Sequence, residues 1–331
     1  MRKLYSVFLL FLLVNLLTAQ EKKVVVATAS MMADMATNIS GGLVEVKCIV
    51  PVGGDPHLHE PTPRDAKLVN GADLIIKNGL TFEGWLNELI ENSGTSAEVV
   101  EVTDGIQPIK STEYKNSADP HAWMDAQLGL IYIKNIKNAL VRLAPKYSKE
   151  FEFNYGIYKK QLEDLDAYIR KAIATIPANK RVLITSHDAF QYYGKAYGIA
   201  LEAVLGTSTE AEAGPSDIIR LNKVIKERQV PAVFIESTVN PKLLKQLAKD
   251  NDVVIGGQLY ADSIGDKDSP APTYIDMLKH NTDVIVAALT RVQEASVDSK
   301  PDSEESTNWL LWTIMASLLI GGFVLMLRMQ S

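Results

Sequence analysis

Short apolar runs alternate with helical segments along most of this chain, and this alternation limits the fold more than any other feature. The runs before residue 105 are KVVVATAS, VEVKCIVPV, DLIIKNG and AEVVEVTDG, with helical segments between them. After residue 179 the same pattern returns with KRVLITS, ALEAVLG, PAVFIEST and DVVIGGQLYA. Such runs predict parallel βα units, and therefore an α/β fold of parallel sheets flanked by helices.

One long helical segment separates the two series of βα units. Apolar side chains recur at helical spacing from Phe151 to Ile173, and no Gly or Pro follows Gly156 within the segment. Some 30 helical residues would span about 45 Å, which is longer than one small domain. We therefore expect two α/β lobes, residues 20–145 and 177–294, bridged by one helix over 146–176. A pair of helices kinked near Gly156 is the alternative.

The N-terminus has the pattern of a secretory signal peptide. Arg2 and Lys3 precede an apolar core of about fifteen residues, and the step Leu17-Thr18-Ala19 predicts cleavage before Gln20. An uncleaved anchor is the alternative, because Leu17 is larger than such sites prefer. No cysteine lies near this step, so residues 1–19 are not a lipoprotein signal.

The C-terminus predicts a membrane anchor. Residues 309–327 hold no charged side chain, and 19 helical residues span about 28 Å, close to the hydrocarbon thickness of a bilayer. Residues 295–308 are polar and acidic, which is typical of a flexible tether. We therefore expect an exported domain held outside the cytoplasm by a transmembrane helix in the cytoplasmic membrane; a buried helix of a soluble fold is the alternative.

Composition excludes several classes of function. The chain has 40 acidic and 34 basic residues among 331, which gives no electrostatic footprint for nucleic acid. Cys48 is the only cysteine, so neither an internal disulfide nor a cysteine metal cluster can form. No GxxxxGK[ST] phosphate loop is present. A metal site in this chain must therefore use His, Asp and Glu.

Four candidate metal ligands follow predicted strands. His57 and His121 lie beyond strands of the first lobe, and His187 and Asp262 follow strands of the second. Ligands of open α/β sheets bind at the carboxyl ends of strands, so a cleft between the lobes can bring the four together. Three imidazoles and one carboxylate suit zinc or another first-row divalent ion. Solvated loop histidines are the alternative, because the ligands are far apart in sequence.

The motifs around these residues resemble those of the metal-specific solute-binding proteins that serve zinc and manganese ABC importers. They are GGDPHLHEPTPRD, DPHAWMD, SHDAFQYYGKAYG, PAVFIESTVNPKLL and LYADSIGDKDSPAPTYIDMLKHN, in this order. The resemblance implies two lobes around a buried cation, with His57, His121, His187 and Asp262 as its ligands. It also implies a receptor, not an enzyme, which delivers the ion to a membrane permease driven by a cytoplasmic ATPase.

The sequence departs from the family pattern in three ways. Many members have a lipid anchor or none, whereas this chain has the predicted C-terminal helix. The segment IKSTEYKNSAD lacks the histidines that zinc receptors often insert there. His59 stands where the family often has Tyr, so its role stays open.

The donor set favours zinc over manganese, with iron a lesser option, because manganese prefers oxygen ligands. The third ligand supports this preference, since a Glu there is associated with manganese receptors and this chain has His187. We expect affinity to fall below about pH 6, where imidazole protonates. Zn²⁺, or Mn²⁺, is thus the expected bound and transported ligand.

Several neighbouring residues have two interpretations. Asp55, Asp119 and Asp188 are candidates to orient the ligand rings, or else cap turns and helices. Trp123 and Phe190 either cover the site or fill the core. Glu236 is expected to be a supporting polar residue, and His280 a surface or interlobe contact.

Two rival functions remain. A secreted zinc hydrolase would use His57-Leu58-His59 as an HxH element, although a catalytic zinc keeps an open coordination position and a nearby base. A surface adhesin (cell adhesion) has no sequence feature of its own here.

Overall fold

The computed structural model describes residues 21–110, 118–209, 214–291 and Arg328. The described residues up to Arg291 belong to one compact unit. The predicted signal peptide, tether and transmembrane helix lie outside the described residues. Within the described part of the chain, no helix is both long enough and apolar enough to cross a membrane.

The N-terminal lobe is built on a four-stranded parallel sheet in the order β2-β1-β3-β4. The strands are β1 (Val24–Ala27), β2 (Glu45–Cys48), β3 (Leu74–Lys77) and β4 (Glu98–Glu101). Helices α2 (Ser30–Ser40), α3 (Pro63–Asn70) and α4 (Leu86–Ser93) connect them. Helix α3 begins sharply because Thr62 and Asp65 form a capping box before Pro63. Every predicted strand of this lobe is present.

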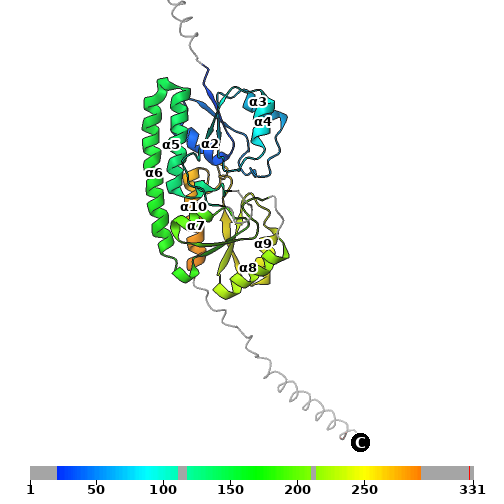
Figure 1. Ribbon diagram of the computed structural model, residues 1–331. Helices are drawn as coiled ribbons and strands as arrows, with labels where there is room; N and C mark the ends of the chain where they lie inside the picture. The colour runs from blue at the N-terminus through cyan, green and yellow to red at the C-terminus, as the bar shows by residue number, and fades with distance from the viewer. Residues whose placement is uncertain (1–20, 111–117, 210–213, 292–327, 329–331) are drawn as a thin grey trace, which may run out of the picture. The chain divides into compact units, whose positions relative to one another are not determined.

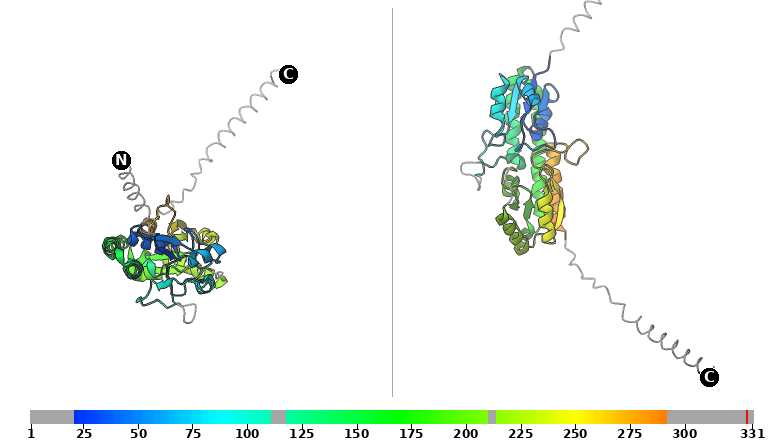
Figure 2. Two further views of the ribbon diagram at one scale, coloured as in Figure 1. Left: turned by 90° about the horizontal axis from the view of Figure 1, so that it is seen from above. Right: turned by 90° about the vertical axis from the view of Figure 1, so that its right-hand side faces the viewer.

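The C-terminal lobe contains two parallel strand pairs. Strand β5 (Val182–Thr185) pairs with β6 (Ala200–Ala203), and β7 (Ala232–Glu236) pairs with β8 (Val254–Leu259). Strand β5 also lies beside β7. The helices are α7 (Gln191–Tyr197), α8 (Pro215–Arg228), α9 (Lys242–Asp250) and α10 (Tyr274–Thr290). The predicted α/β class with two lobes of parallel strands is confirmed, and Figure 2 shows the lobes stacked end to end.

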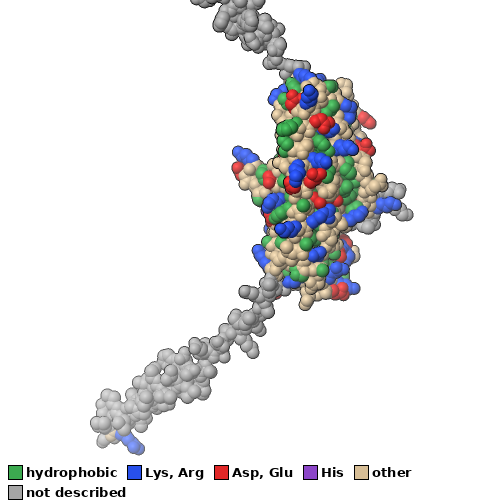
Figure 3. Space-filling view, turned by 90° about the vertical axis from the view of Figure 1, so that its left-hand side faces the viewer, with side chains coloured by type: hydrophobic (Ala, Val, Ile, Leu, Met, Phe, Trp, Pro, Cys, Tyr) green, Lys and Arg blue, Asp and Glu red, His purple; other side chains and the backbone are tan. Residues whose placement is uncertain are grey.

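Helix α6 (Ser148–Ala174) runs along both lobes as one continuous helix of 27 residues (Figure 1). It contacts α2 of the first lobe and α7 and α10 of the second. Its inner face buries Phe151, Leu162 and Ile169 in one core shared with both lobes. Gly156 does not interrupt the helix, so the kinked pair is not formed. On the outer side, Figure 3 shows acidic and basic side chains interspersed, as expected for a solvated helix face.

A second long helix lies beside α6 and was not anticipated from the sequence. Helix α5 (Ala126–Leu143) follows the His121 loop, and Asp125 caps its first turn by accepting from the Gln127 amide. Its buried side includes Gly129, where a methyl group would lie 2.7 Å from the hydroxyl of Tyr274 on α10. The lobes are therefore joined through packed helices and not through α6 alone.

Candidate metal centre

The structure brings all four predicted ligand residues together where the two lobes meet. One ligand atom from each of His57, His121, His187 and Asp262 can be chosen so that all lie within 4.8 Å of one another. His187 follows β5 and Asp262 follows β8, while His57 and His121 come from loops beyond β2 and β4. The carboxyl ends of strands in both lobes thus face one point, as in other open α/β sheets.

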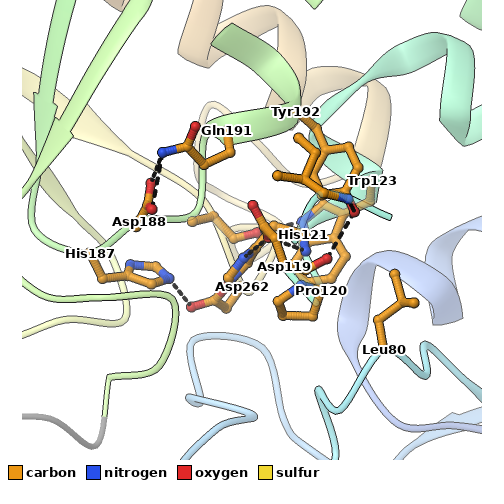
Figure 4. A network of polar contacts seen from close by, with 12 residues as sticks. Leu80, Asp119, Pro120, His121, Trp123, His187, Asp188, Gln191, Tyr192 and Asp262 are labelled. Carbon is orange, nitrogen blue, oxygen red and sulfur yellow. Dashed lines mark hydrogen bonds and ion pairs between the residues drawn. The ribbon is translucent and has the colours of Figure 1, made fainter. Parts of the chain in front are cut away.

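The donor atoms point inward. The Nε2 atoms of His57 and His121 are 3.3 Å apart. The Asp262 carboxylate lies between the lobes, with Oδ1 3.3 Å from Nε2 of His121 and Oδ2 3.1 Å from Nε2 of His187. Figure 4 shows His121, His187 and Asp262 converging in this way. The side chains of these three residues are fully buried, whereas His57 lies at the edge.

Several buried polar atoms at this point lack a hydrogen-bond partner among the described residues. Both carboxylate oxygens of Asp262 and Nε2 of His187 form no hydrogen bond of acceptable geometry, although the two oxygens lie within ion-pair distance of the His121 and His187 rings. Leaving such atoms unsatisfied is costly, and a bound cation would satisfy them together. Three imidazole nitrogens and one carboxylate oxygen fit zinc or a neighbouring divalent ion.

Two further carboxylates contact the Nδ1 atoms of the buried His121 and His187 rings, on the side away from the proposed ion. Oδ1 of Asp119 accepts from the His121 backbone amide at 2.9 Å and lies 2.8 Å from Nδ1 of its ring. Glu236, at the end of β7, accepts from the His187 backbone amide at 2.9 Å, and its Oε2 lies 2.5 Å from Nδ1 of the ring. Carboxylates behind metal-binding histidines fix the ring orientation and raise ligand basicity.

The role of Glu236 goes beyond the supporting part expected from the sequence. Its signal in the sequence is its strand-end position, but only the placement of β7 beside β5 shows that it reaches His187. The other two candidate acids do not reach a ring. Asp55 accepts from the His57 backbone amide and from Thr209 Oγ1, and Asp188 accepts from Gln191 (Figure 4).

Burial and neighbouring charges shift the pKa values of the four proposed ligands in opposite directions when no metal is bound. Burial lowers the pKa of His57 to about 3. Burial also opposes protonation of His121, but the hydrogen bond with Asp119 and the interaction with the nearby Asp262 carboxylate outweigh it and raise its pKa to about 9. Burial is likewise outweighed at His187, where the charges of Glu236 and Asp262 raise the pKa well above its usual value. Despite burial, both imidazoliums hold the pKa of Asp262 well below its usual value.

Aromatic side chains cover the centre. The Phe82 ring contacts His57 edge-on, with centroids 4.9 Å apart, and also packs on Trp123 at 4.8 Å. Trp123 Nε1 donates to the backbone oxygen of Ala261, next to Asp262 in the other lobe, at 2.9 Å. Phe190 is buried and packs against Tyr193. Of the two predicted aromatics, Trp123 directly borders a ligand, since its ring centroid lies 5.2 Å from that of His121, and it links the lobes. Phe82 was not predicted from the sequence.

The other two histidines, His59 and His280, are not among the four residues whose ligand atoms converge. His59 lies 3.2 Å from Asp65 Oδ2 through its Nε2 atom, and its ring contacts Trp85. His280, on α10, lies 3.2 Å from the backbone oxygen of Gln258 through Nε2 and packs against Tyr260. Among the described residues, neither histidine joins the group that can hold a metal.

Comparison with known proteins gives consistent results. The family model described as "Zinc-uptake complex component A periplasmic" matches residues 25–288. The chain is 38% identical to the zinc-binding protein TroA of Treponema pallidum, over 82% of this chain and 91% of that protein. It is 34% identical to the manganese ABC transporter substrate-binding lipoprotein PsaA of Streptococcus anginosus, over 88% of this chain and all of that protein.

Two solved structures of metal-binding proteins are also similar to this chain. The periplasmic zinc binding protein TroA superimposes with a TM-score of 0.78, covering 82% of this chain and all of that one at 38% identity. The Mn-bound periplasmic metal binding protein of Candidatus Liberibacter asiaticus gives a TM-score of 0.75, at 32% identity over 81% of this chain and all of that one.

Proposed function

Because this chain belongs to the family of periplasmic zinc-uptake complex component A proteins, we propose that it captures a divalent transition-metal ion outside the cytoplasm and delivers it to an ABC permease. The family membership confirms the resemblance found in the sequence motifs. The observation that carries the proposal is the convergence of four ligand atoms at a buried point between the lobes. The ion is cargo, and the protein is a receptor, not an enzyme.

The proposed ligands are His57, His121, His187 and Asp262. Their support is geometric, because the four ligand atoms converge within 4.8 Å, three of the four residues are buried, and the carboxylate oxygens of Asp262 and Nε2 of His187 form no hydrogen bond among the described residues. Zinc is the expected ion, with manganese next, because three of the four donors are nitrogen. A hydrolase would need a coordination position open to substrate. Full burial of three of the four ligand side chains opposes this alternative.

Delivery requires that the ion leave a buried site when the receptor meets its permease. The lobes share one hydrophobic core, and α6, α5 and α10 pack across their junction. Such packing favours small adjustments at the junction over a wide hinge opening. Contacts across the junction, such as Trp123 to Ala261, are therefore the ones that a docked permease would have to loosen.

We further propose that residues 309–327 anchor the receptor in the cytoplasmic membrane after export directed by residues 1–19. Tethering raises the effective concentration of receptor at the permease, as a lipid anchor would. Removal of residues 309–331 should move the protein from the membrane to the soluble fraction without changing its metal affinity. Recovery of the truncated protein with the membrane would contradict the anchor. An adhesin role has no support in the described features.

The function is tested by metal analysis of the purified full-length chain, followed by competition titrations with zinc and manganese at neutral pH. We expect one ion per chain and tighter binding of zinc. Failure to bind either ion would refute the proposal. Metal-dependent turnover of an ester, peptide or phosphate would favour the hydrolase.

A further inference from the structure

A cavity of about 540 Å³ adjoins the metal centre on the His57 side. Of the four proposed ligands only His57 lines it, while the side chains of the other three are fully buried. Leu58 and Glu60, both exposed, also line the cavity, so it is open to solvent. An ion that enters through this cavity therefore meets the His57 edge of the centre first.

His59 lines the same cavity and is held in a defined orientation. Its Nε2 atom lies 3.2 Å from Oδ2 of Asp65, and that oxygen also accepts hydrogen bonds from the backbone amide and the hydroxyl of Thr62. Its ring contacts Trp85, with centroids 4.7 Å apart. The side chain retains 14% exposure, so it is neither fully buried nor free in solvent.

This arrangement leaves one ring nitrogen able to bind a metal. The Asp65 oxygen acts as an acceptor, so the tautomer of a neutral His59 ring that fits this contact has its hydrogen on Nε2 and a lone pair on Nδ1. Nδ1 has no hydrogen-bond partner among residues 21–110, 118–209 and 214–291. A carboxylate on one imidazole nitrogen and a free lone pair on the other is the arrangement that metal-binding histidines adopt.

The charge of the cavity also favours a cation. Among the described residues that line it, Glu60 is acidic and none is Lys or Arg. A carboxylate without a basic side chain beside it in this lining attracts an approaching cation.

We propose that His59 is an entry ligand, whose Nδ1 atom binds the incoming divalent ion transiently before the ion passes to His57 and the buried centre. The proposal rests on the proposed metal-receptor function and deepens it. A single protein ligand gives weak binding, so the ion does not stay there, and water completes its coordination. The two histidines of the loop then have separate roles: His59 assists entry of the ion, and His57 binds the ion in the buried centre.

An entry ligand has a kinetic signature that a structural residue lacks. It lowers the barrier between solvent and the centre, and the same barrier is crossed in both directions. Its loss must therefore slow association and dissociation by one common factor and leave Kd unchanged. A residue that supports the bound state would instead change dissociation and Kd, as most interface changes do.

The test uses the full-length protein and Zn²⁺ alone as the probe. Association is followed by rapid mixing with a competing fluorescent zinc chelator, and dissociation by transfer to that chelator, extrapolated to zero chelator. For His59→Phe and His59→Gln we expect both rate constants to fall by the same factor of about three to ten, with Kd unchanged. Two replacements of different shape separate loss of the nitrogen from a local packing defect.

His280→Phe is the matched control, because His280 is a partly exposed histidine remote in sequence from the cavity and not among its lining residues. It should leave both rate constants unchanged. Unaltered rates in the His59 variants, or a change in only one of the two rate constants, would overturn the entry role. Neither result would affect the receptor function, which fails only if the wild-type protein does not bind zinc at equilibrium.

Discussion

Zinc binding near neutral pH should release about two protons per ion from this protein. In the metal-free centre the pKa of His121 is raised to about 9, and that of His187 is raised well above its usual value. At pH 7.5 each of these rings is therefore mostly imidazolium, with about one proton more than the neutral imidazole, and zinc must displace that extra proton. His57, with its pKa lowered to about 3, and the ionised Asp262 contribute almost none. Three imidazoles with unperturbed pKa values would release only about 0.3 proton at this pH.

The same protonation sets the pH dependence of affinity. Because the raised pKa values belong to the metal-free state, protons compete with zinc at every pH below about 9. With two protons displaced, affinity should rise about 100-fold per pH unit between pH 6.5 and 7.5. Competition therefore begins well above the value of about pH 6 expected from ordinary imidazoles.

The proton count is measured by calorimetric titration of zinc into metal-free protein at pH 7.5. The experiment is repeated in weakly coordinating buffers of different ionisation enthalpy, and the slope of the observed enthalpy against the ionisation enthalpy equals the protons released. Asp119→Asn is the matched variant, since it removes one charge that raises the pKa of His121. It should reduce the count by up to about one proton.

A wild-type count below about 0.5 at pH 7.5 would refute the reasoning. It would show that the carboxylates behind the rings do not hold them protonated before the ion arrives. An unchanged count in Asp119→Asn would remove that residue from the explanation.

Four further substitutions test the metal centre and the packing around it. His57→Ala should weaken zinc binding by more than about 100-fold, because loss of a ligand exceeds the usual effect of an outer partner. His59→Tyr should keep Kd within about threefold, since this ring lies outside the ligand set. Glu236→Gln should weaken binding about 10- to 100-fold by releasing the ring it supports. Competition with a chelating dye measures all three. Gly129→Ala should lower the free energy of unfolding by about 1–3 kcal/mol, because its methyl would press on Tyr274, and thermal unfolding measures it.

Each of these expectations has a contradicting outcome. Equal losses in the His57 and His59 variants would place both histidines on the metal. Asp188→Asn is the control for Glu236→Gln, since Asp188 is a carboxylate next to His187 that hydrogen-bonds Gln191 instead of a ring. If it proved as damaging, the assignment of Glu236 would be wrong. An unchanged unfolding temperature in Gly129→Ala would show that α5 and α10 can separate at that point.

The spacing of apolar residues in the sequence was sufficient to predict most of the strands and the long helix. Each predicted strand is present, and the apolar spacing from Phe151 to Ile173 forms one helix. Helix α5 was missed although Tyr132, Ile133, Ile136 and Leu140 form a buried stripe at helical spacing. The βα alternation does not predict α5, because no strand lies between α5 and α6.

The sequence by itself determined the α/β class, the long bridging helix and the residues that could bind a metal, because helix and strand periods and donor chemistry are local properties. Only the tertiary structure decided how those residues meet and which side chains support them. His59 is two residues from His57, yet its ring contacts Asp65 and Trp85 and lies outside the ligand set. Asp262 belongs to the ligand set although it is 205 residues after His57 in the sequence. Asp188 is the neighbour of His187 in sequence, but Glu236 holds its ring because β7 lies beside β5. Contacts of this kind depend on which strands become neighbours and how the lobes close, and no short stretch of the chain encodes that order.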